Sequence, residues 1–416
     1  MSTEGFEQGE GEGAGERQPG KRGISRRGVL KWLGIGVGGV VVAAAGTAGV
    51  RGALNGVWNS GAGAPYELWS AWPSMTGVES VVAAGILAAN PHNTQPWRID
   101  VRDDTVRISS DASRWMHLND ASGREHIAGI GCAVENMVVA ARAQGLDARV
   151  TAFPAASDPT LVAVVELRPA SPATAAEAEL AATIVQRHTD RGPYSTEPLT
   201  RETLSELDSV AGADEPARLV TIDDAEAKRG LGELYVQATT AIVGDRKQSV
   251  EAFSWFRNDR TDIDRHRDGL TLDCQGFDEF TLAMAKILPA SSREDGDRFW
   301  VNATRNVHTA TAAAYGVVVV DDVLDPRAQF AGGRLLERLH LHAARLGLGF
   351  QHMNQITERI DHAKATGAPD TFSEPWVRLT GVPAAEGLLS FRIGHPTREA
   401  KASPRRALGD VVTFAG

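Results

Sequence analysis

A loop of hydrogen-bonding side chains between two prolines is the first place where the sequence could bind a ligand. Residues 90–97 read Asn-Pro-His-Asn-Thr-Gln-Pro-Trp, with a predicted helix before them and a predicted strand after them. Asn90, Asn93 and Gln95 carry amides, which both donate and accept hydrogen bonds, and the prolines restrict the backbone. The pattern favours a rigid loop suited to reading the edge of a flat heterocycle.

Two groups of arginines could hold a phosphate. Arg187 and Arg191 flank a histidine and a threonine at the end of a predicted helical stretch. Near the C-terminus, Arg392 opens a second basic group that ends with Arg405 and Arg406. Arginine binds phosphate through charge-assisted hydrogen bonds and can place a positive charge beside an anionic ring. Both groups are therefore candidate phosphate sites.

Each of these clusters also has a simpler interpretation. Loops rich in Asn, Pro and Thr are commonly turns, a charged stretch such as 187–191 is commonly a solvated helix end, and a C-terminal arginine pair is commonly surface. Residues 255–277 form a charged insert, which is either a lid over a ligand or a solvated loop. Taken singly, none of these segments establishes a site.

The elements that must position these residues are of mixed type. In the first half, patterning predicts helices at 77–89 and 124–144 and strands at 97–101, 105–109, near Arg149 and at 161–167. In the second half, it predicts helices at 224–242, 277–288, 298–314 and 329–346 and strands at 315–321, 376–380 and 388–393. The sequence therefore predicts an α+β fold.

The sequence also contains a repeat with an offset of 202 residues. Identical residues in two helical segments are Gly131 and Gly333, Glu135 and Glu337, Ala141 and Ala343, Gly145 and Gly347, and Leu146 and Leu348. Each segment ends in Gly-Leu, as a helix with a glycine C-cap does. Chance identity in helices rich in Ala and Gly is the alternative. The repeat predicts two α+β units, 66–190 and 191–416, folded as an internal dimer with a binding site at its interface.

The first 65 residues have the character of a targeting segment followed by a linker. Residues 1–24 are rich in Gly and Glu and are expected to be disordered. Residues 25–51 place Arg26 and Arg27 before an uncharged run at 32–50, which is typical of a twin-arginine export signal. A membrane anchor is the alternative, since the run nearly spans a bilayer. Residues 52–65 are expected to be a linker. We expect export across the cytoplasmic membrane by the twin-arginine machinery, with membrane association possible through 32–50.

Composition excludes several classes of protein. Lys and Arg number 43 against 53 Asp and Glu, a formal net charge of -10, which is the wrong sign for a nucleic-acid partner. The two cysteines, Cys132 and Cys274, are too few for a cysteine-based metal site, although they allow one disulfide. His340 and His342 diverge on a helix, so we expect no metal.

Taken together, the three clusters resemble the FMN-dependent nitroreductase family. The loop at 90–97 is similar to that family's Gln-Pro-Trp segment, and Arg187, His188, Thr189 and Arg191 resemble its phosphate and flavin motif. In an ordinary member the arginine motif comes first. Here the order is reversed and each motif occurs once, which resembles the fused, pseudo-dimeric Acg-like subgroup.

The resemblance implies duplicated nitroreductase-like units in an intrachain pseudo-dimer around one FMN per chain. It implies the following cofactor-binding residues: Asn90, Pro91, His92, Asn93, Gln95, Arg187, His188, Thr189, Arg191, Met353, Asn354, Arg405 and Arg406. Among these, Arg187 and Thr189 with Arg405 or Arg406 would bind the phosphate, Arg191 would lie near the ring, and a backbone N–H near Met353 or Asn354 would address N5.

The implied activity is an oxidoreductase that passes two electrons through FMN to a nitroaromatic, a quinone or a similar acceptor. The partners would be small-molecule electron donors and acceptors, with NAD(P)H as the expected donor. Hydride transfer at the flavin needs no side-chain acid or nucleophile, so no catalytic residue is expected. The alternative is a flavin-binding or sequestering protein with a closed site and little turnover.

Overall fold

The computed structural model describes residues 50–212 and 215–415. The expectations of a disordered segment at 1–24 and of a signal or anchor at 25–51 fall outside these residues, apart from its last two positions. All described residues belong to one compact unit, residues 40–416. Within them, no helix combines the length and the apolarity that crossing a membrane requires.

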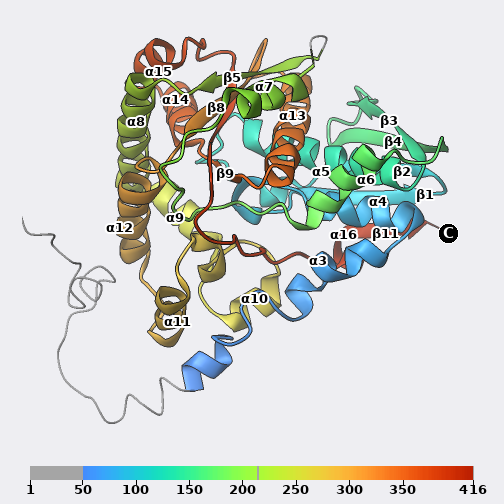
Figure 1. Ribbon diagram of the computed structural model, residues 1–416, viewed down its shortest axis with the longest axis horizontal. Helices are drawn as coiled ribbons and strands as arrows, with labels where there is room; N and C mark the ends of the chain where they lie inside the picture. The colour runs from blue at the N-terminus through green and yellow to red at the C-terminus, as the bar shows by residue number, and fades with distance from the viewer. Residues whose placement is uncertain (1–49, 213–214, 416) are drawn as a thin grey trace, which may run out of the picture. The chain divides into compact units, whose positions relative to one another are not determined.

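The first half is built on a mixed five-stranded sheet in the order β11-β1-β2-β4-β3 (Figure 1). Its strands are β1 (Trp97–Arg102), β2 (Thr105–Ser110), β3 (Leu146–Ala152), β4 (Leu161–Pro169) and β11 (Val412–Ala415). Side chains of β1 alternate strictly between buried and exposed, which marks a sheet with one covered face. Helices α4 (Gly77–Ile86) and α5 (Arg124–Ala143) supply much of the apolar cluster against which this sheet packs.

The second half is built on an antiparallel sheet in the order β5-β8-β10-β9. Its strands are β5 (Ala217–Ile222), β8 (Ala314–Val320), β9 (Gly349–His352) and β10 (Gly387–Gly394). Every residue of β8 and β10 is buried. In β8, Val318 and Val320 pack in the cluster that contains α13 (Pro326–Arg345), whereas Val317 and Val319 pack with α8 (Ala225–Gly244). Both faces of this sheet are therefore covered.

The two long helices α5 and α13 pack against each other between the two sheets (Figure 1). A side chain at Gly131 would clash with the carbonyl oxygen of Phe330, and one at Gly333 would clash with that of Ala128. Phe330 and Ala128 are themselves 202 residues apart, as are the two glycines. The contact is therefore nearly the same from either helix, as in the interface of a symmetric dimer.

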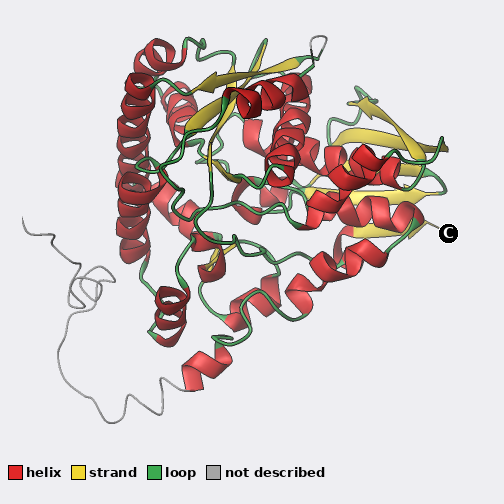
Figure 2. Cartoon of the chain, viewed as in Figure 1, coloured by secondary structure: helices red, strands yellow, loops and turns green. Residues whose placement is uncertain are grey.

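The C-terminal strand crosses from one half to the other. β11 lies in the second half of the sequence, yet it pairs in parallel with β1, with Ile99 opposite Val412. Figure 2 shows this strand at the edge of the first sheet, opposite to β3. The segment before it carries Arg405 and Arg406, so the crossing brings the C-terminal arginines to the loop at 90–97.

The described residues also contain shorter elements. The further helices are α3 (Glu67–Ala71), α6 (Ala175–Ala182), α7 (Arg201–Val210), α9 (Arg246–Ser254), α10 (Arg260–His266), α11 (Glu279–Ile287), α12 (Arg293–Ala303), α14 (Gln355–Thr366), α15 (Ser373–Thr380) and α16 (Leu408–Val411). Two short strands, β6 (Phe256–Arg257) and β7 (Leu270–Thr271), form a separate ribbon. Helical turns of other types are η1 (Ala64–Tyr66), η2 (Trp72–Ser74), η3 (Pro91–Asn93), η4 (Ala112–Arg114), η5 (Thr183–Val185), η6 (Leu272–Gln275) and η7 (Thr304–His308).

The predicted α+β class is confirmed, and two predicted elements are wrong. Residues 376–380 form the end of helix α15 and not a strand. Their alternation of apolar and polar residues imitates a strand, but Asp370 accepts hydrogen bonds from the first backbone N–H groups and Gly381 ends the helix with φ 69°. The helix expected at 298–314 ends at Ala303 and continues as a π turn, η7, before β8 begins.

Residues 51–60, which fall in the last position of the predicted signal and in the predicted linker, contact the second half. Arg51 Nη2 donates to Leu288 O at 3.2 Å, and Asn55 Nδ2 donates to Lys286 O at 2.8 Å. Lys286 Nζ in turn donates to Ser60 Oγ at 2.8 Å. This segment therefore packs on the end of α11.

Candidate functional site

The loop at 90–97 joins three distant parts of the chain. His92, Asn93 and Gln95 all have positive φ, between 46° and 54°. Asn93 Nδ2 donates to Gly269 O at 3.2 Å and to Pro404 O at 2.8 Å. Gln95 Nε2 donates to an insert carbonyl at 2.9 Å, and Gln95 Oε1 accepts from a C-terminal backbone N–H at 2.9 Å. The side-chain amides of Asn93 and Gln95 are already hydrogen-bonded within the protein, so their role is to hold the insert and the C-terminal segment against the loop.

Asn90 and Pro91 begin the same loop. Asn90 Nδ2 donates to Ala88 O at 3.1 Å, and Asn90 Oδ1 accepts from the backbone N–H of Gln95 at 2.7 Å. Pro91 opens the turn η3, and Gly129 of α5 packs against Asn90 and Pro91. A larger residue than glycine at 129 would press on both, so α5 fixes where the loop begins.

The segment 187–191 runs beside β9 of the second sheet. Thr189 forms a parallel bridge with Phe350, and the backbone N–H of Asp190 donates to Phe350 O at 2.9 Å. Side chains at 188 and 190 therefore point to the opposite side from that at 189. The His188 ring lies edge-on to Trp69, at 4.7 Å between centroids.

Arg187 and Arg405 meet beneath this segment. Arg187 Nη2 donates to Leu87 O at 2.8 Å, and Arg405 Nη2 donates to the same oxygen at 3.0 Å. Arg187 Nε lies 3.0 Å from Glu337 Oε1, an ion pair without hydrogen-bond alignment, while Arg405 Nη1 donates to Asn93 Oδ1 at 2.7 Å. Both guanidinium groups are thus engaged by the protein, and they act on a ligand chiefly through their charge.

Three histidines lie near these arginines and are held neutral by burial. Burial lowers the pKa of His92 to about 4, with a smaller contribution from Arg191. It lowers the pKa of His188 and of His352 to about 3, with Arg187 as the next cause in both. His352 Nε2 is buried without a hydrogen-bond partner among the described residues. A ligand atom there would satisfy an otherwise unpaired group.

Two more buried arginines have no ion pair with a carboxylate among the described residues. Arg191 Nη1 donates to Cys274 O at 3.0 Å, and burial lowers the pKa of Arg191. Arg392 is fully buried, lies 4.0 Å from the centre of the Tyr194 ring and donates to Gly192 O at 2.6 Å. Arg392 had only been considered as the start of a phosphate clamp; its signal was a charged residue inside the apolar strand at 388–393.

The balance of charge in this region is positive. Four buried or half-buried arginines, 187, 191, 392 and 405, face two buried carboxylates, Glu337 and Asp190. Burial raises the pKa of both carboxyl groups. We call this set the buried basic cluster. A buried excess of positive charge is costly unless an anion accompanies it, so the cluster suits a phosphate-bearing ligand.

The backbone N–H groups of Met353 and Asn354 differ in whether they are available to donate to a ligand. The backbone N–H of Met353 donates to Ser390 O at 2.8 Å, so it is not free to address a ring nitrogen. Asn354 precedes helix α14, and its Oδ1 accepts from Ser390 N at 2.9 Å. Of the two, the backbone of Asn354 is the better candidate donor.

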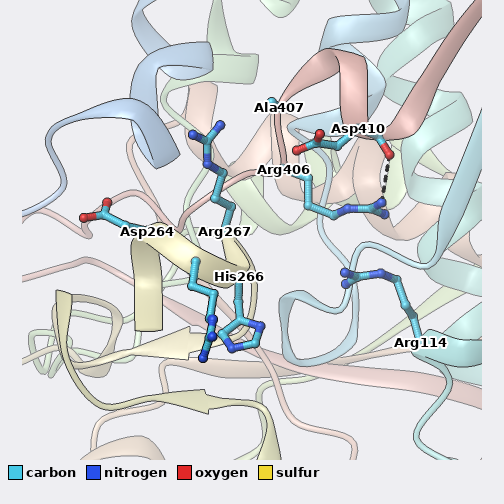
Figure 3. Close-up of a pocket in the computed structure, with 8 residues that line it drawn as sticks. Arg114, Asp264, His266, Arg267, Arg406, Ala407 and Asp410 are labelled. Carbon is cyan, nitrogen blue, oxygen red and sulfur yellow. Dashed lines mark hydrogen bonds between the residues drawn. The ribbon is translucent and has the colours of Figure 1, made fainter. Parts of the chain in front are cut away.

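Arg406 points away from the buried basic cluster. It lines an open pocket of about 690 Å³ with Arg114, Asp410 and four residues of the insert, 264–267 (Figure 3). The insert is folded as β6, α10, β7 and η6, and its Asp268 is buried in ion pairs with Arg114 at 2.9 Å and Arg257 at 2.6 Å. The alternative of a freely solvated loop does not describe this part of the insert.

Sequence reasoning missed several residues of the site. No sequence pattern marks His352, Trp69 or Glu337 as neighbours of Arg187. The Arg187 guanidinium lies 5.9 Å from the centre of the Trp69 ring. Both cysteines are buried free thiols. In the described residues, no group of three or more His, Cys, Asp or Glu is placed to hold a metal ion.

Comparisons with known proteins indicate relatives for part of the chain. No family model matches it. A putative NAD(P)H nitroreductase, acg, of Mycobacterium tuberculosis H37Rv is 34% identical over 178 residues, which are 43% of this chain and 53% of that protein. A second, Rv3131, is 33% identical over 135 residues, 32% of this chain and 39% of that protein. The chain thus spans about half the length, or less, of these curated relatives.

Solved nitroreductases give a weaker likeness. One from Desulfitobacterium hafniense with bound FMN has a TM-score of 0.35 and 16% identity, covering 57% of this chain and 98% of that chain. The FMN-dependent nitroreductase NfnB from Mycobacterium smegmatis, in complex with NADPH, has a TM-score of 0.35 and 13% identity, covering 57% and 99%. At this level the likeness carries no conclusion. Sequence relationship to putative NAD(P)H nitroreductases is what the comparisons establish.

Proposed function

We propose that this chain is an FMN-dependent oxidoreductase of the nitroreductase type, which uses NAD(P)H to reduce a nitroaromatic, a quinone or a similar acceptor by two electrons. The observation that carries the proposal is the buried basic cluster, which has more arginines than carboxylates and lies where the loop at 90–97 meets the segment 187–191. The names of the sequence relatives support the same reaction class.

The residues present fit an anionic, planar cofactor. FMN carries a phosphate, which arginines bind well, and a flat ring system, which histidine and amide edges can contact. His352 Nε2 has no partner among the described residues, and the Arg191 guanidinium donates through Nη1 to Cys274 O, so His352 Nε2 and the other Arg191 nitrogens can donate to a ligand. The fit therefore favours FMN over a neutral ligand.

The residues that would contact the ligand are those whose side chains are not already hydrogen-bonded within the protein. Arg191 and Thr189 would hold the phosphate or the ring, because Arg187 and Arg405 already bond to the protein. His188 lies on the opposite side of the segment, against Trp69. His92 and His352 would contact the ligand as neutral rings. When bound, FMN supplies hydride transfer at its N5, which needs no side-chain acid.

Arg187 and Arg405 then act as positioning residues. Each donates to Leu87 O, so together they fix the end of α4 against the segment 187–191. Burial, followed by the nearby Arg187, lowers the pKa of Arg405 to about 9. An anion close to the pair would offset this repulsion and hold the loop at 90–97 in place.

Anaerobic mixing of the FMN-loaded full chain with NADH and with NADPH tests the reaction class. An oxidoreductase of this type is expected to lose its oxidised flavin absorbance on mixing, and an added acceptor should restore it. A protein that only stores flavin would stay oxidised with both nucleotides. That outcome would replace the proposal by the flavin-sequestering alternative.

A pair of variants tests the cofactor site. Arg191→Gln should weaken FMN retention by about tenfold, the usual effect of losing a hydrogen bond to a charged group. Arg229→Gln is the matched control, because Arg229 lies in an exposed ion pair with Glu233 on α8. Equal FMN retention in both variants would remove Arg191 from the site.

We also propose that residues 25–51 direct export by the twin-arginine route, with 32–50 as a possible membrane attachment. The support is the Arg26–Arg27 pair before an uncharged run. Replacing both arginines by lysine should leave the protein in the cytoplasm, as measured by cell fractionation. Unchanged export of that variant would exclude the route.

A further inference from the structure

The open pocket at the insert has the character of an anion site. It measures about 690 Å³, within the size range of small-molecule sites. Its charged lining residues are Arg114, Asp264, Arg265, Arg267, Arg406 and Asp410. Four arginines thus face two aspartates, and Asp264 is already paired with Arg260 at 2.9 Å. The lining is therefore positive overall.

We propose that this pocket binds a phosphorylated small molecule that carries at least two negative charges. Arginine forks match phosphate oxygens in pairs, and several arginines around one space favour a dianion over a carboxylate. The proposal concerns the insert and the C-terminal arginine. It does not depend on FMN in the buried basic cluster.

Arg406 is the first residue that points to a ligand. Its Nη1 is buried and has no partner among the described residues, while Nη2 donates to Asp410 O at 2.9 Å. Burial and then the nearby Arg114 guanidinium lower the pKa of Arg406. An anion between the two guanidinium groups would supply the missing acceptor and offset their repulsion.

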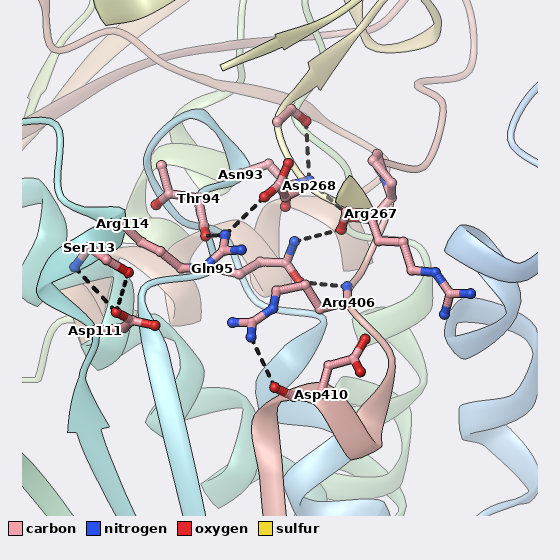
Figure 4. A network of polar contacts seen from close by, with 12 residues as sticks. Asn93, Thr94, Gln95, Asp111, Ser113, Arg114, Arg267, Asp268, Arg406 and Asp410 are labelled. Atoms are coloured by element: carbon pink, nitrogen blue, oxygen red, sulfur yellow. Dashed lines mark hydrogen bonds and ion pairs between the residues drawn. The ribbon is translucent and has the colours of Figure 1, made fainter. Parts of the chain in front are cut away.

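Arg267 is the second. It has φ 52° at the end of α10, a backbone conformation that side chains rarely adopt. Its carbonyl is held by Gln95 Nε2 at 2.9 Å, and its guanidinium has no hydrogen bond or ion pair to another described residue. Figure 4 shows this guanidinium extending away from the network that fixes its backbone. Arg267 thus combines a strained backbone with a guanidinium group that no other described residue binds.

The pocket is separate from the buried basic cluster, yet the two are linked. Arg405 and Arg406 are neighbours in the chain, but their side chains lie in different surroundings. Arg405 lies over the Trp69 ring at 4.8 Å, whereas Arg406 lines the pocket (Figure 3). Gln95 is fully buried and bonds both the Arg267 carbonyl and the Arg406 backbone N–H (Figure 4). A ligand in the pocket can therefore affect the position of the loop at 90–97 through Gln95.

The test is calorimetric titration of the full chain with inorganic pyrophosphate. Wild-type protein should bind it, and raising the salt concentration should weaken binding because the site is open to solvent. Arg267→Asn should weaken binding by about tenfold or more, since asparagine tolerates the left-handed backbone but lacks the charge. Arg267→Lys, which keeps the charge, should restore part of the affinity.

Arg229→Gln on α8 is the control for a general loss of positive charge, and it should bind pyrophosphate like wild type. Arg406→Gln provides a second variant if Arg267→Asn does not fold. Absence of pyrophosphate binding by wild type, or equal affinity in wild type and Arg267→Asn, would overturn the proposal.

Competition identifies the source of the phosphate. If NADPH displaces pyrophosphate and NADH does not, the occupant is the 2′-phosphate of a nucleotide. If neither displaces it, the occupant is a free phosphorylated metabolite, and the pocket is still an anion site. The two proposals can fail independently. Absence of pyrophosphate binding would leave the FMN proposal unchanged, and absence of FMN binding would leave the proposal for the open pocket unchanged.

Discussion

Glu135 and Glu337 occupy equivalent positions in the two long helices, 202 residues apart, but they face different surroundings. Glu135 pairs with Arg334 at 2.7 Å and with Arg338 at 3.0 Å, whose side chains are 27% and 21% exposed. Glu337 is fully buried beside Arg187 and accepts from the backbone N–H of Ala89 at 3.2 Å. One copy thus stabilises the edge of the helix pair, and the other supports the candidate site.

The loops that precede these helices differ in the same way. In the first half, the middle of the loop at 90–97 is buried, with Thr94 and Gln95 fully so. In the second half, residues 289–292 are exposed and lead into α12. The comparison shows that the two long helices are alike in the two halves, whereas the loop at 90–97 is buried beside the candidate site and residues 289–292 are exposed.

The largest expected difference between the halves is at the two glutamates. Glu337→Gln leaves Arg187 buried without a charged partner, so the free energy of unfolding should fall by about 3–5 kcal/mol. Glu135→Gln should cost less, because Glu135 is also buried but its partners Arg334 and Arg338 are partly exposed and can turn to water. Chemical denaturation of both variants measures the difference. Equal losses would contradict the comparison.

Equivalent substitutions on the two sides of the contact between α5 and α13 should lower the stability by similar amounts. Gly131→Ala and Gly333→Ala each place a methyl group against a backbone carbonyl of the other helix, so each should cost about 1–3 kcal/mol of stability. Gly244→Ala at the end of α8 is the control, because nothing lies within 4 Å of a side chain there. Thermal unfolding that shows one of the two interface variants unaffected would break the symmetry argument.

A further difference between the halves concerns the carboxyl group of Asp120, which lies just before α5. Burial, and then the nearby Glu125, raises the pKa of Asp120 to about 8, while its counterpart Asp322 is exposed. Because the folded protein holds this proton more tightly than the unfolded chain, stability should fall as pH rises from about 4 to about 8. Asp120→Asn should flatten this fall, and Asp322→Asn should not. Parallel pH profiles for all three proteins would rule the difference out.

Much of the framework could be predicted from the sequence. The alternation in β1 and the apolar run of β8 produce clear patterns, and the long helices α5 and α13 carry their repeat and their glycine ends. Local periodicity is enough for such elements. It fails at 376–380, where the caps at Asp370 and Gly381 decide for a helix.

The site could be predicted only as a set of candidates. The sequence indicated that 90–97, 187–191 and 405–406 belong together. In the structure Arg405 donates to Asn93 of the loop, and Arg187 and Arg405 both donate to Leu87 O, just before the loop. The sequence could not indicate which donors are consumed by the protein, as at Asn93 and Arg187, because those bonds depend on tertiary contacts. The separation of Arg405 from Arg406 likewise depends on tertiary contacts, with Arg405 over the Trp69 ring and Arg406 in the open pocket.

The most direct test of the account is the number of FMN molecules that one full-length chain binds. Titration of flavin-free protein with FMN, followed by flavin absorbance after removal of unbound ligand, gives this number. The account expects one FMN per chain, since only the first half carries the buried loop at 90–97. Two bound molecules would contradict the difference between the halves, and none would contradict the cofactor itself.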